Sequence, residues 1–554
     1  MTLPAQITTN LFSDFKNSFI GPFPKVSQVV QDTDNSVGQA IGSTNPQKAA
    51  QSFQVSEAGE LTSVDLYTKK NNSPTDSIIV KICADNAGEP GTVLATGTSI
   101  SVSTYVGTAF KYARSVFFLP PSLSTSTTYW ITAERSGTLD ATNHFIWQNA
   151  TGNPYANGKM RTYNGSTWAD VSSGNGDARF KVNVRVNGRY QPCVDKTNNK
   201  VRMFKSTDNG NTWSEQDSAD VPSISSTANF KSLSVVVIDA QFQLFYPSGA
   251  SQLSLCLFDT TTDQWSSPTN LTSVTLNTSV SGTHPALAGY RGNGEASGST
   301  SSRCIALQGA TETVMGSPRR RIKLKRRLGG ASPAFNSGDG YDIVGSANTP
   351  DATLPGTAVD YDLRAVIVDG NDMFHMFWTQ SDDSNIHHRQ FSIDNAFSTA
   401  NLMGSTAAVT SNSAAYPVGI GTGYFQAGDY YIALPYVDSG VIKVARCLAS
   451  GAATAGNWTI TSVVTATIET TNSNPCALMA DNEQGGKLTL IYTKTDGKLY
   501  YTHDQASDTW VAEQELHTGT KTVGAISGGV LSDAMGICYL DTAPATDDLK
   551  FDSL

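Results

Sequence analysis

The sequence predicts an all-β protein, and three observations lead to this prediction. Glycine occurs 47 times in 554 residues, charged residues make up only 16%, and serine, threonine and asparagine are abundant. Short runs of alternating apolar and polar residues recur between Gly, Pro and Asn, as in strands joined by turns. No apolar pattern keeps the 3.6-residue period of a helix over the length of one. A chain of this length is too long to fold around one hydrophobic core of ordinary size, so two or three domains are expected.

Charge and composition narrow the classes of function. The net charge of −10 and the isoelectric point of about 5.2 argue against a general nucleic-acid binder. No apolar run approaches the ~20 residues of a membrane span. Residues 1–6 lack the basic and apolar regions of a signal peptide, so we expect a protein made in a cytosol. The seven cysteines contain no C-x-x-C pair and mostly lie in apolar runs, which predicts small buried side chains.

The first part of the chain divides in two. Residues 1–44 are polar and irregular and are predicted to form an arm. An arm without its own core needs a surface, so it is expected to lie on a neighbouring subunit or another protein, or else to be a free tail. Residues 45–186 alternate with period two, which predicts a β-sandwich. Its expected strands lie at 52–55, 61–67, 78–82, 116–119, 128–132 and 178–184.

Residues 187–554 repeat a unit of strands that ends in an aromatic residue. Trp213 and Trp265 are 52 residues apart, as are Trp458 and Trp510. A period near 50 with four strands per unit predicts a β-propeller. Blades are expected to start near 188, 232, 283, 358, 415, 474 and 522, although short units at both ends leave six or seven blades open. If the two ends share a blade, the ring closes without an open sheet edge.

One turn has a specific pattern, S-x-D-x-G-x-T-W, formed by Ser206, Asp208, Gly210, Thr212 and Trp213. The aspartate can accept hydrogen bonds from its own turn, the glycine can adopt a positive φ, and the tryptophan can anchor the returning strand. The pattern resembles the Asp box of sialidase-like β-propellers. In that family the box lies between the third and fourth strands of a blade, away from the catalytic pocket. The resemblance therefore implies a structural role for these residues.

Residues 45–186 also resemble a known kind of module. The runs L-T-S-V-D-L-Y at 61–67, T-T-Y-W-I at 127–131 and D-A-R-F-K-V at 177–182 resemble the jelly-roll modules of phage structural proteins and bacterial surface proteins. An N-terminal jelly-roll β-sandwich followed by a six- or seven-bladed propeller looks like a tailed-phage virion protein, a tail or head appendage. The resemblance implies a non-catalytic role in assembly and in host-surface recognition. It implies virion localisation and no cofactor. The implied partners are other virion proteins, further copies of the chain, and a host-surface glycan or protein.

A secreted glycoside hydrolase of sialidase-like fold, with the jelly roll as a carbohydrate-binding module, is the alternative. Such an enzyme needs three arginines around a carboxylate, a tyrosine activated by a glutamate, and an aspartic acid. The early Arg-Ile-Pro signature of that family is absent. Arg364 and Arg446 could reach a pocket, but glutamate is scarce after residue 320. A purely structural virion component without a ligand is a second alternative.

The basic run 319–327 is the one abnormal charge feature of an acidic chain. Two interpretations are open: a solvated outer strand of the third blade, or a contact for an anionic partner such as an acidic subunit face, nucleic acid or an acidic polysaccharide. The basic residues of this run are Arg319, Arg320, Arg321, Lys323, Lys325, Arg326 and Arg327.

No metal site is expected. His387 and His388 are adjacent, so on a half-exposed strand they point to opposite faces and cannot readily share an ion.

Overall fold

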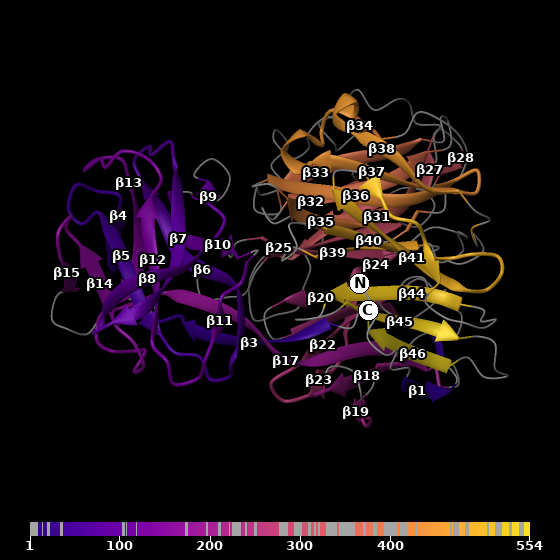
Figure 1. Ribbon diagram of the computed structural model, residues 1–554, viewed down its shortest axis with the longest axis horizontal. Coiled ribbons are helices and arrows are strands. Elements are labelled where there is room, and N and C mark those ends of the chain that lie inside the picture. The colour runs from indigo at the N-terminus through magenta and orange to yellow at the C-terminus, as the bar shows by residue number, and fades with distance from the viewer. Residues whose placement is uncertain are drawn as a thin grey trace.

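β-Strands make up both lobes of the computed structural model, a smaller lobe and a larger one (Figure 1). The structure describes the strands and the connections between them, except residues 1–8, residue 554 and gaps in the loops. The longer gaps are 224–233, 276–285, 293–301, 328–340, 343–360, 393–406, 410–417, 469–475, 516–522 and 542–547. Among the described residues, no helix has the length and apolar character needed to cross a membrane.

The smaller lobe is a β-sandwich, as the alternation predicts. One antiparallel sheet has the order β15-β14-β5-β12-β7-β8, and the other centres on β6, which pairs with β13, β17, β10 and β11. The bounds in the first sheet are β15 Trp168–Asp170, β14 Met160–Tyr163, β5 Lys48–Phe53, β12 Tyr129–Arg135, β7 Ser77–Asn86 and β8 Glu89–Thr96. Those in the second are β6 Gly59–Asn71, β13 His144–Ala150, β17 Phe180–Asp195, β10 Lys111–Val116 and β11 Ser122–Leu123. Jelly-roll connectivity stays a prediction.

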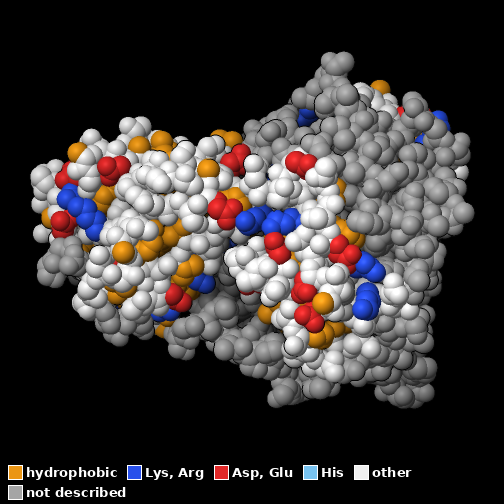
Figure 2. Space-filling view, turned by 90° about the horizontal axis from the view of Figure 1, so that it is seen from below, with side chains coloured by type: hydrophobic (Ala, Val, Ile, Leu, Met, Phe, Trp, Pro, Cys, Tyr) orange, Lys and Arg blue, Asp and Glu red, His pale blue; other side chains and the backbone are white. Residues whose placement is uncertain are grey.

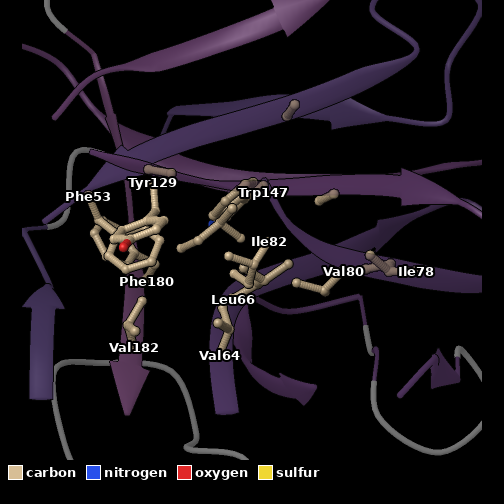
Figure 3. Close-up of a cluster of buried hydrophobic side chains, with 14 of the residues drawn as sticks. Phe53, Val64, Leu66, Ile78, Val80, Ile82, Tyr129, Trp147, Phe180 and Val182 are labelled. Atoms are coloured by element: carbon tan, nitrogen blue, oxygen red, sulfur yellow. The ribbon is translucent and has the colours of Figure 1, made fainter. Parts of the chain in front are cut away.

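The sandwich core lies between these two sheets (Figure 3). Val64 and Leu66 on β6 face it, as do Val80 and Ile82 on β7, because every second side chain of a strand points to the same face. Trp147 is fully buried, and its indole Nε1 donates a hydrogen bond of 2.9 Å to a backbone carbonyl. Burying one such apolar side chain contributes about 1.5–3 kcal/mol. The alternating runs therefore supply most of the driving force for this lobe.

The larger lobe is a β-propeller. Counted over the described residues it has six separate antiparallel sheets of four or five strands, and the end of the sandwich's second sheet beyond β17 forms one more blade, so the seven-bladed alternative applies. The first strands of successive blades contact one another in turn, from β20 through β25, β31, β35 and β39 to β44. The first blade ends in β18 Lys200–Ser206 and β19 Ser214–Gln216, and the second comprises β20 Ser234–Ile238, β21 Gln241–Pro247, β22 Gln252–Asp259 and β23 Gln264–Trp265.

The other five blades follow in chain order. The third comprises β25 Ala286–Gly292, β26 Ser302–Gln308, β29 Ile322–Arg327 and β30 Tyr341–Asp342. The fourth comprises β31 Tyr361–Val368, β32 Met373–Gln380, β33 Ile386–Ser392 and β34 Ala407–Ala408. The fifth comprises β35 Thr422–Gln426, β36 Asp429–Asp438, β37 Val441–Leu448 and β38 Thr459–Thr465. The sixth comprises β39 Cys476–Asp481, β40 Lys487–Thr493, β41 Leu499–Ala506 and β42 Thr509–Trp510. The seventh contains β44 Val523–Val530, β45 Met535–Asp541 and β46 Asp548–Ser553.

The N-terminal segment pairs within its own chain, which differs from the arm expected to lie on another molecule or to be free. β1 (Thr9–Ser13) adds to β46 as the outer strand of the seventh blade, and Phe12 is opposite Leu549. β2 (Phe15–Ser18) adds to β17 as a strand of the first blade. These pairings satisfy the backbone groups of two strand edges that would otherwise be open. The two ends of the described chain thus share a blade and close the ring.

The sandwich is inserted into the first blade, between its strands β2 and β17. β3 (Phe23–Gln31) and β4 (Val37–Ile41) continue from the arm and pair with β17 and β13 of the sandwich. β17 itself belongs to both lobes: residues 180–186 pair with β6, and residues 189–195 pair with β18. Gly188 marks the change with a φ of 130°, a conformation that L side chains rarely adopt.

The described cysteines behave as the sequence predicts. Cys83, Cys256, Cys447 and Cys476 are free and buried. Burial raises the pKa of each thiol, to about 12 for Cys256, so these side chains stay protonated and unreactive at neutral pH.

Candidate functional site

The turn that contains Asp208 connects β18 to β19, the last two strands of the first blade. Its carboxylate accepts hydrogen bonds from the Thr212 backbone N–H at 2.8 Å, the Thr212 hydroxyl at 2.6 Å and the Ser206 hydroxyl at 2.8 Å. Burial opposes ionisation, but these hydrogen bonds outweigh it and lower the pKa of Asp208. Trp213 is half-buried, and Gly210 lies outside the described residues. These three hydrogen bonds close the turn.

A second turn joins the first blade to the next one. Asp263 lies between β22 and β23 with a φ of 57°. Its carboxylate accepts a hydrogen bond of 2.5 Å from the hydroxyl of Tyr190 on β17 and forms an ion pair of 2.5 Å with Lys205 on β18. Burial and the neighbouring Asp263 carboxylate both raise the pKa of Tyr190. Polar residues of this turn therefore hold two blades together.

The basic run falls on two strands of the third blade region. β28 (Ser317–Arg319) pairs with β27 (Glu312–Val314), and β29 lies between β26 and β30 as the third strand of its sheet. Ile322 is fully buried. Arg320, Arg321 and the side chains of Arg319, Lys323, Lys325, Arg326 and Arg327 lie outside the described residues. Their contact with an anionic partner therefore stays a prediction.

The two candidate pocket arginines are engaged inside blades. Arg364 on β31 donates to the Thr379 hydroxyl on β32 at 2.9 Å and lies 3.9 Å from the carboxylate of Asp362. It is 8% exposed. The guanidinium of Arg364 is therefore occupied by contacts within its own sheet.

Arg446 on β37 is 9% exposed. Its guanidinium carbon lies 4.9 Å from the ring centre of Tyr431 and 5.3 Å from that of Tyr424, within the range of cation–π contacts. It also donates to Gln426 and lies 3.9 Å from the carboxylate of Asp504 on the sixth blade. This arginine joins the fifth and sixth blades.

The histidine pair lies on β33, but the expected half-exposed strand is wrong. His387 is 7% exposed and His388 is fully buried. His387 stacks on Trp378, while His388 contacts Phe377 and Trp458. These aromatic rings cover both faces of the strand, which the local sequence does not reveal.

His388 also has a histidine partner on the neighbouring strand. Its Nε2 lies 3.0 Å from Nδ1 of His375 on β32. Burial, and then the neighbouring His375, lower the pKa of His388 well below its usual value. Among the described residues no group of three or more His, Cys, Asp or Glu side chains has the arrangement of a metal site.

A surface of aromatic and charged side chains lies on the β14–β15 hairpin of the sandwich, and the sequence reasoning missed it. We call Lys48, Glu89, Arg161, Tyr163, Trp168 and Asp170 the hairpin patch. Tyr163 and Trp168 are opposite each other across the hairpin, with ring centres 5.2 Å apart, and both are half-exposed. Trp168 packs on the buried side chains of Ala50, Cys83 and Trp130. The patch is therefore fixed to the first sheet of the sandwich.

A local signal for this hairpin exists in the sequence. Asn164 and Gly165 follow Tyr163, and Asn-Gly between two strands is a strong indication of a tight hairpin. In the structure the Asn164 side chain accepts hydrogen bonds of 2.9 Å from the backbone N–H groups of Ser166 and Thr167. Gly165 has a φ of 107°. The signal could have placed the two aromatic residues side by side.

No protein-family model and no curated protein matches the chain. Solved propeller structures are similar to it at low identity. A fungal lectin of Aleuria aurantia, described as a six-bladed propeller with a fucose recognition mode, is 14% identical over 60% of this chain and 92% of its own, with a TM-score of 0.37. The BP39L lectin of Burkholderia pseudomallei is 12% identical over 79% and 99%, with a TM-score of 0.41. An intramolecular trans-sialidase of Ruminococcus gnavus is 10% identical over 66% and 91%, with a TM-score of 0.34. The protein is an all-β propeller protein with an inserted sandwich.

Proposed function

We propose that this protein is a non-catalytic structural protein of a tailed-phage particle, a tail or head appendage that takes part in assembly and in host-surface recognition. The proposal rests on the way in which the two lobes are connected. The arm closes the propeller, the sandwich is inserted into the first blade, and β17 runs through both lobes. Such a body transmits load without a flexible linker, which suits a particle component that holds one lobe outward.

Both candidate arginines are occupied by contacts within the propeller, which supports a non-catalytic role. Arg364 is held by Thr379 and Asp362 within one blade, and Arg446 lies against Tyr424 and Tyr431 of its own blade and near Asp504 of the next. To clamp a sugar carboxylate, either arginine would first have to leave these partners. The cost of leaving a buried polar group unpaired, about 1–3 kcal/mol, opposes that change.

Two measurements on the full chain test the proposal. Purified particles from the producing culture, labelled with an antibody against the propeller, should show the protein at a fixed position by electron microscopy. The purified protein should release no sugar from sialosides or acidic polysaccharides in a reducing-end assay. Turnover that survives repurification would overturn the non-catalytic role and favour the hydrolase. Absence of label from intact particles would overturn the virion assignment.

A further inference from the structure

We propose that the hairpin patch is a binding site for a neutral oligosaccharide, with a pyranose ring stacked on Trp168 and in contact with Tyr163, whose ring plane is tilted by 45°. This inference deepens the proposed function, because it gives the recognition role a ligand class and a location on the sandwich. The flat faces of indole and phenol rings match the apolar C–H face of a pyranose. Their polar edges remain free to meet water or hydroxyl groups.

The patch is rigid before any ligand arrives. Trp168 is packed against Trp130, which is fully buried and whose Nε1 donates to the Asp85 carboxylate at 2.7 Å. Arg161 joins the two strands of the hairpin through a hydrogen bond of 2.6 Å to Asp170, and it attaches the hairpin to β8 through a hydrogen bond of 2.7 Å to Glu89. A ring held in this way loses little conformational entropy on binding, which favours affinity for a small ligand.

The charged groups around the rings suit hydroxyl groups. Glu89 and Asp170 are 44% and 40% exposed, so oxygens of each remain accessible beside the arginine that holds them. Lys48 is 38% exposed, lies 5.9 Å from the ring centre of Tyr163 and pairs with Glu134 at 2.5 Å. Both donors and acceptors therefore lie beside the aromatic pair. A sugar hydroxyl, which both donates and accepts, can satisfy both kinds at once.

The same charges disfavour other occupants. An apolar protein surface would bury the ion pairs around the rings and pay their desolvation. A polyanion such as nucleic acid would meet the exposed carboxylates of Glu89 and Asp170 on a chain of net charge −10. On the face of the molecule seen in Figure 2, basic and acidic side chains of the described part of the smaller lobe lie next to each other. A neutral, hydroxyl-rich ligand fits best.

Saturation-transfer NMR and isothermal titration with maltohexaose, cellohexaose and chitohexaose test the proposal on the full-length protein. 3′-Sialyllactose serves as a charged probe. At least one neutral probe should bind, with its ring C–H protons receiving the saturation. Trp168→Ala should weaken that binding by about tenfold or more, since losing one good aromatic contact amounts to roughly a decade in affinity. Trp168→Phe should retain part of the binding, and Leu119→Ala, at an exposed residue outside the patch, should leave it unchanged.

The outcomes of these experiments test the location of the site and the class of its ligand. Binding that survives both Trp168→Ala and Tyr163→Ala would overturn the location, and binding of sialyllactose alone would overturn the neutral class. No binding of any probe overturns the proposal as stated. Self-association of the native chain in sedimentation that Trp168→Ala abolishes would instead make the patch a contact between copies. Particle labelling is independent of all these results, so the site can fail while the virion role stands, and the reverse.

Discussion

At the scale of single residues, Asp208 illustrates how a carboxylate can hold a turn in place. Three hydrogen bonds from Ser206 and Thr212 end on it, and all three are local to the turn between β18 and β19. Asp208→Ala should therefore lower the local unfolding free energy of the first blade by about 1.5–3 kcal/mol, the range for hydrogen bonds to a charged group. Faster hydrogen exchange at the Thr212 amide and in β18 is the expected readout.

The control for this change is Asp220→Ala, at an exposed aspartate a few residues further along the same blade. It should leave exchange in β18 unchanged. Equal effects of the two substitutions would mean that the turn hydrogen bonds contribute nothing specific.

Glu134 provides a pH prediction at the same scale. Burial raises its pKa, but hydrogen bonds and charge from Lys48 and Lys81 outweigh burial and lower the pKa overall. A carboxyl group with a lowered pKa in the folded state stabilises the protein above its unfolded pKa of about 4.3 and loses that contribution as the pH falls through the folded value. The wild type should therefore melt above Glu134→Gln at pH 7, and the difference should disappear towards pH 3. Thermal scans across this range measure it, and a difference that grows on acidification would contradict the assignment.

At the scale of elements, β1 and β2 matter most, because each completes a blade. Deleting residues 1–18 removes the partners of β46 and of one edge of β17, and leaves two strand edges open. We expect loss of exchange protection in β46 and in residues 193–195 of β17, a lower melting temperature, and aggregation at high concentration. Deleting residues 1–8 alone removes neither strand and should change none of these. Unchanged protection of β46 after the longer deletion would show that the arm is dispensable.

The same elements show where sequence reasoning reached its limit. Alternation predicted β6, β7 and β12, because a half-buried strand carries its period in its own side chains. The tryptophan spacing predicted the blades. The arm appeared irregular because β1 is stabilised by backbone pairing with a strand at the far end of the chain, and nothing local records that partner. Alternation does not reveal the hairpin patch, because β14 and β15 are too short to show a period, and only the Asn164–Gly165 turn marks their aromatic residues as cross-strand neighbours.

At the scale of the whole molecule, the two lobes are less separable than the sequence boundaries 45–186 and 187–554 suggest. A fragment of residues 45–186 lacks β3 and β4, and with them the fully buried Ile41 and the Asp32 partner of Arg179. A fragment of residues 23–186 keeps them. The shorter fragment should melt at a lower temperature or aggregate, since burying Ile41 alone contributes about 1.5–3 kcal/mol. Circular dichroism melts of both fragments measure this, and equal melting would contradict the role of β3 and β4.

The pairing of Phe12 with Leu549 also sets an order of events during synthesis. A ribosome adds about 5–20 residues per second, so roughly half a minute to two minutes separate the emergence of these two residues. The sandwich and the first blade can form in that interval, while the last blade cannot be completed. The propeller ring therefore stays open until its final strand has been synthesised. During that wait an unpaired edge is open to a chaperone, or to the same strand of a neighbouring copy on the same messenger RNA.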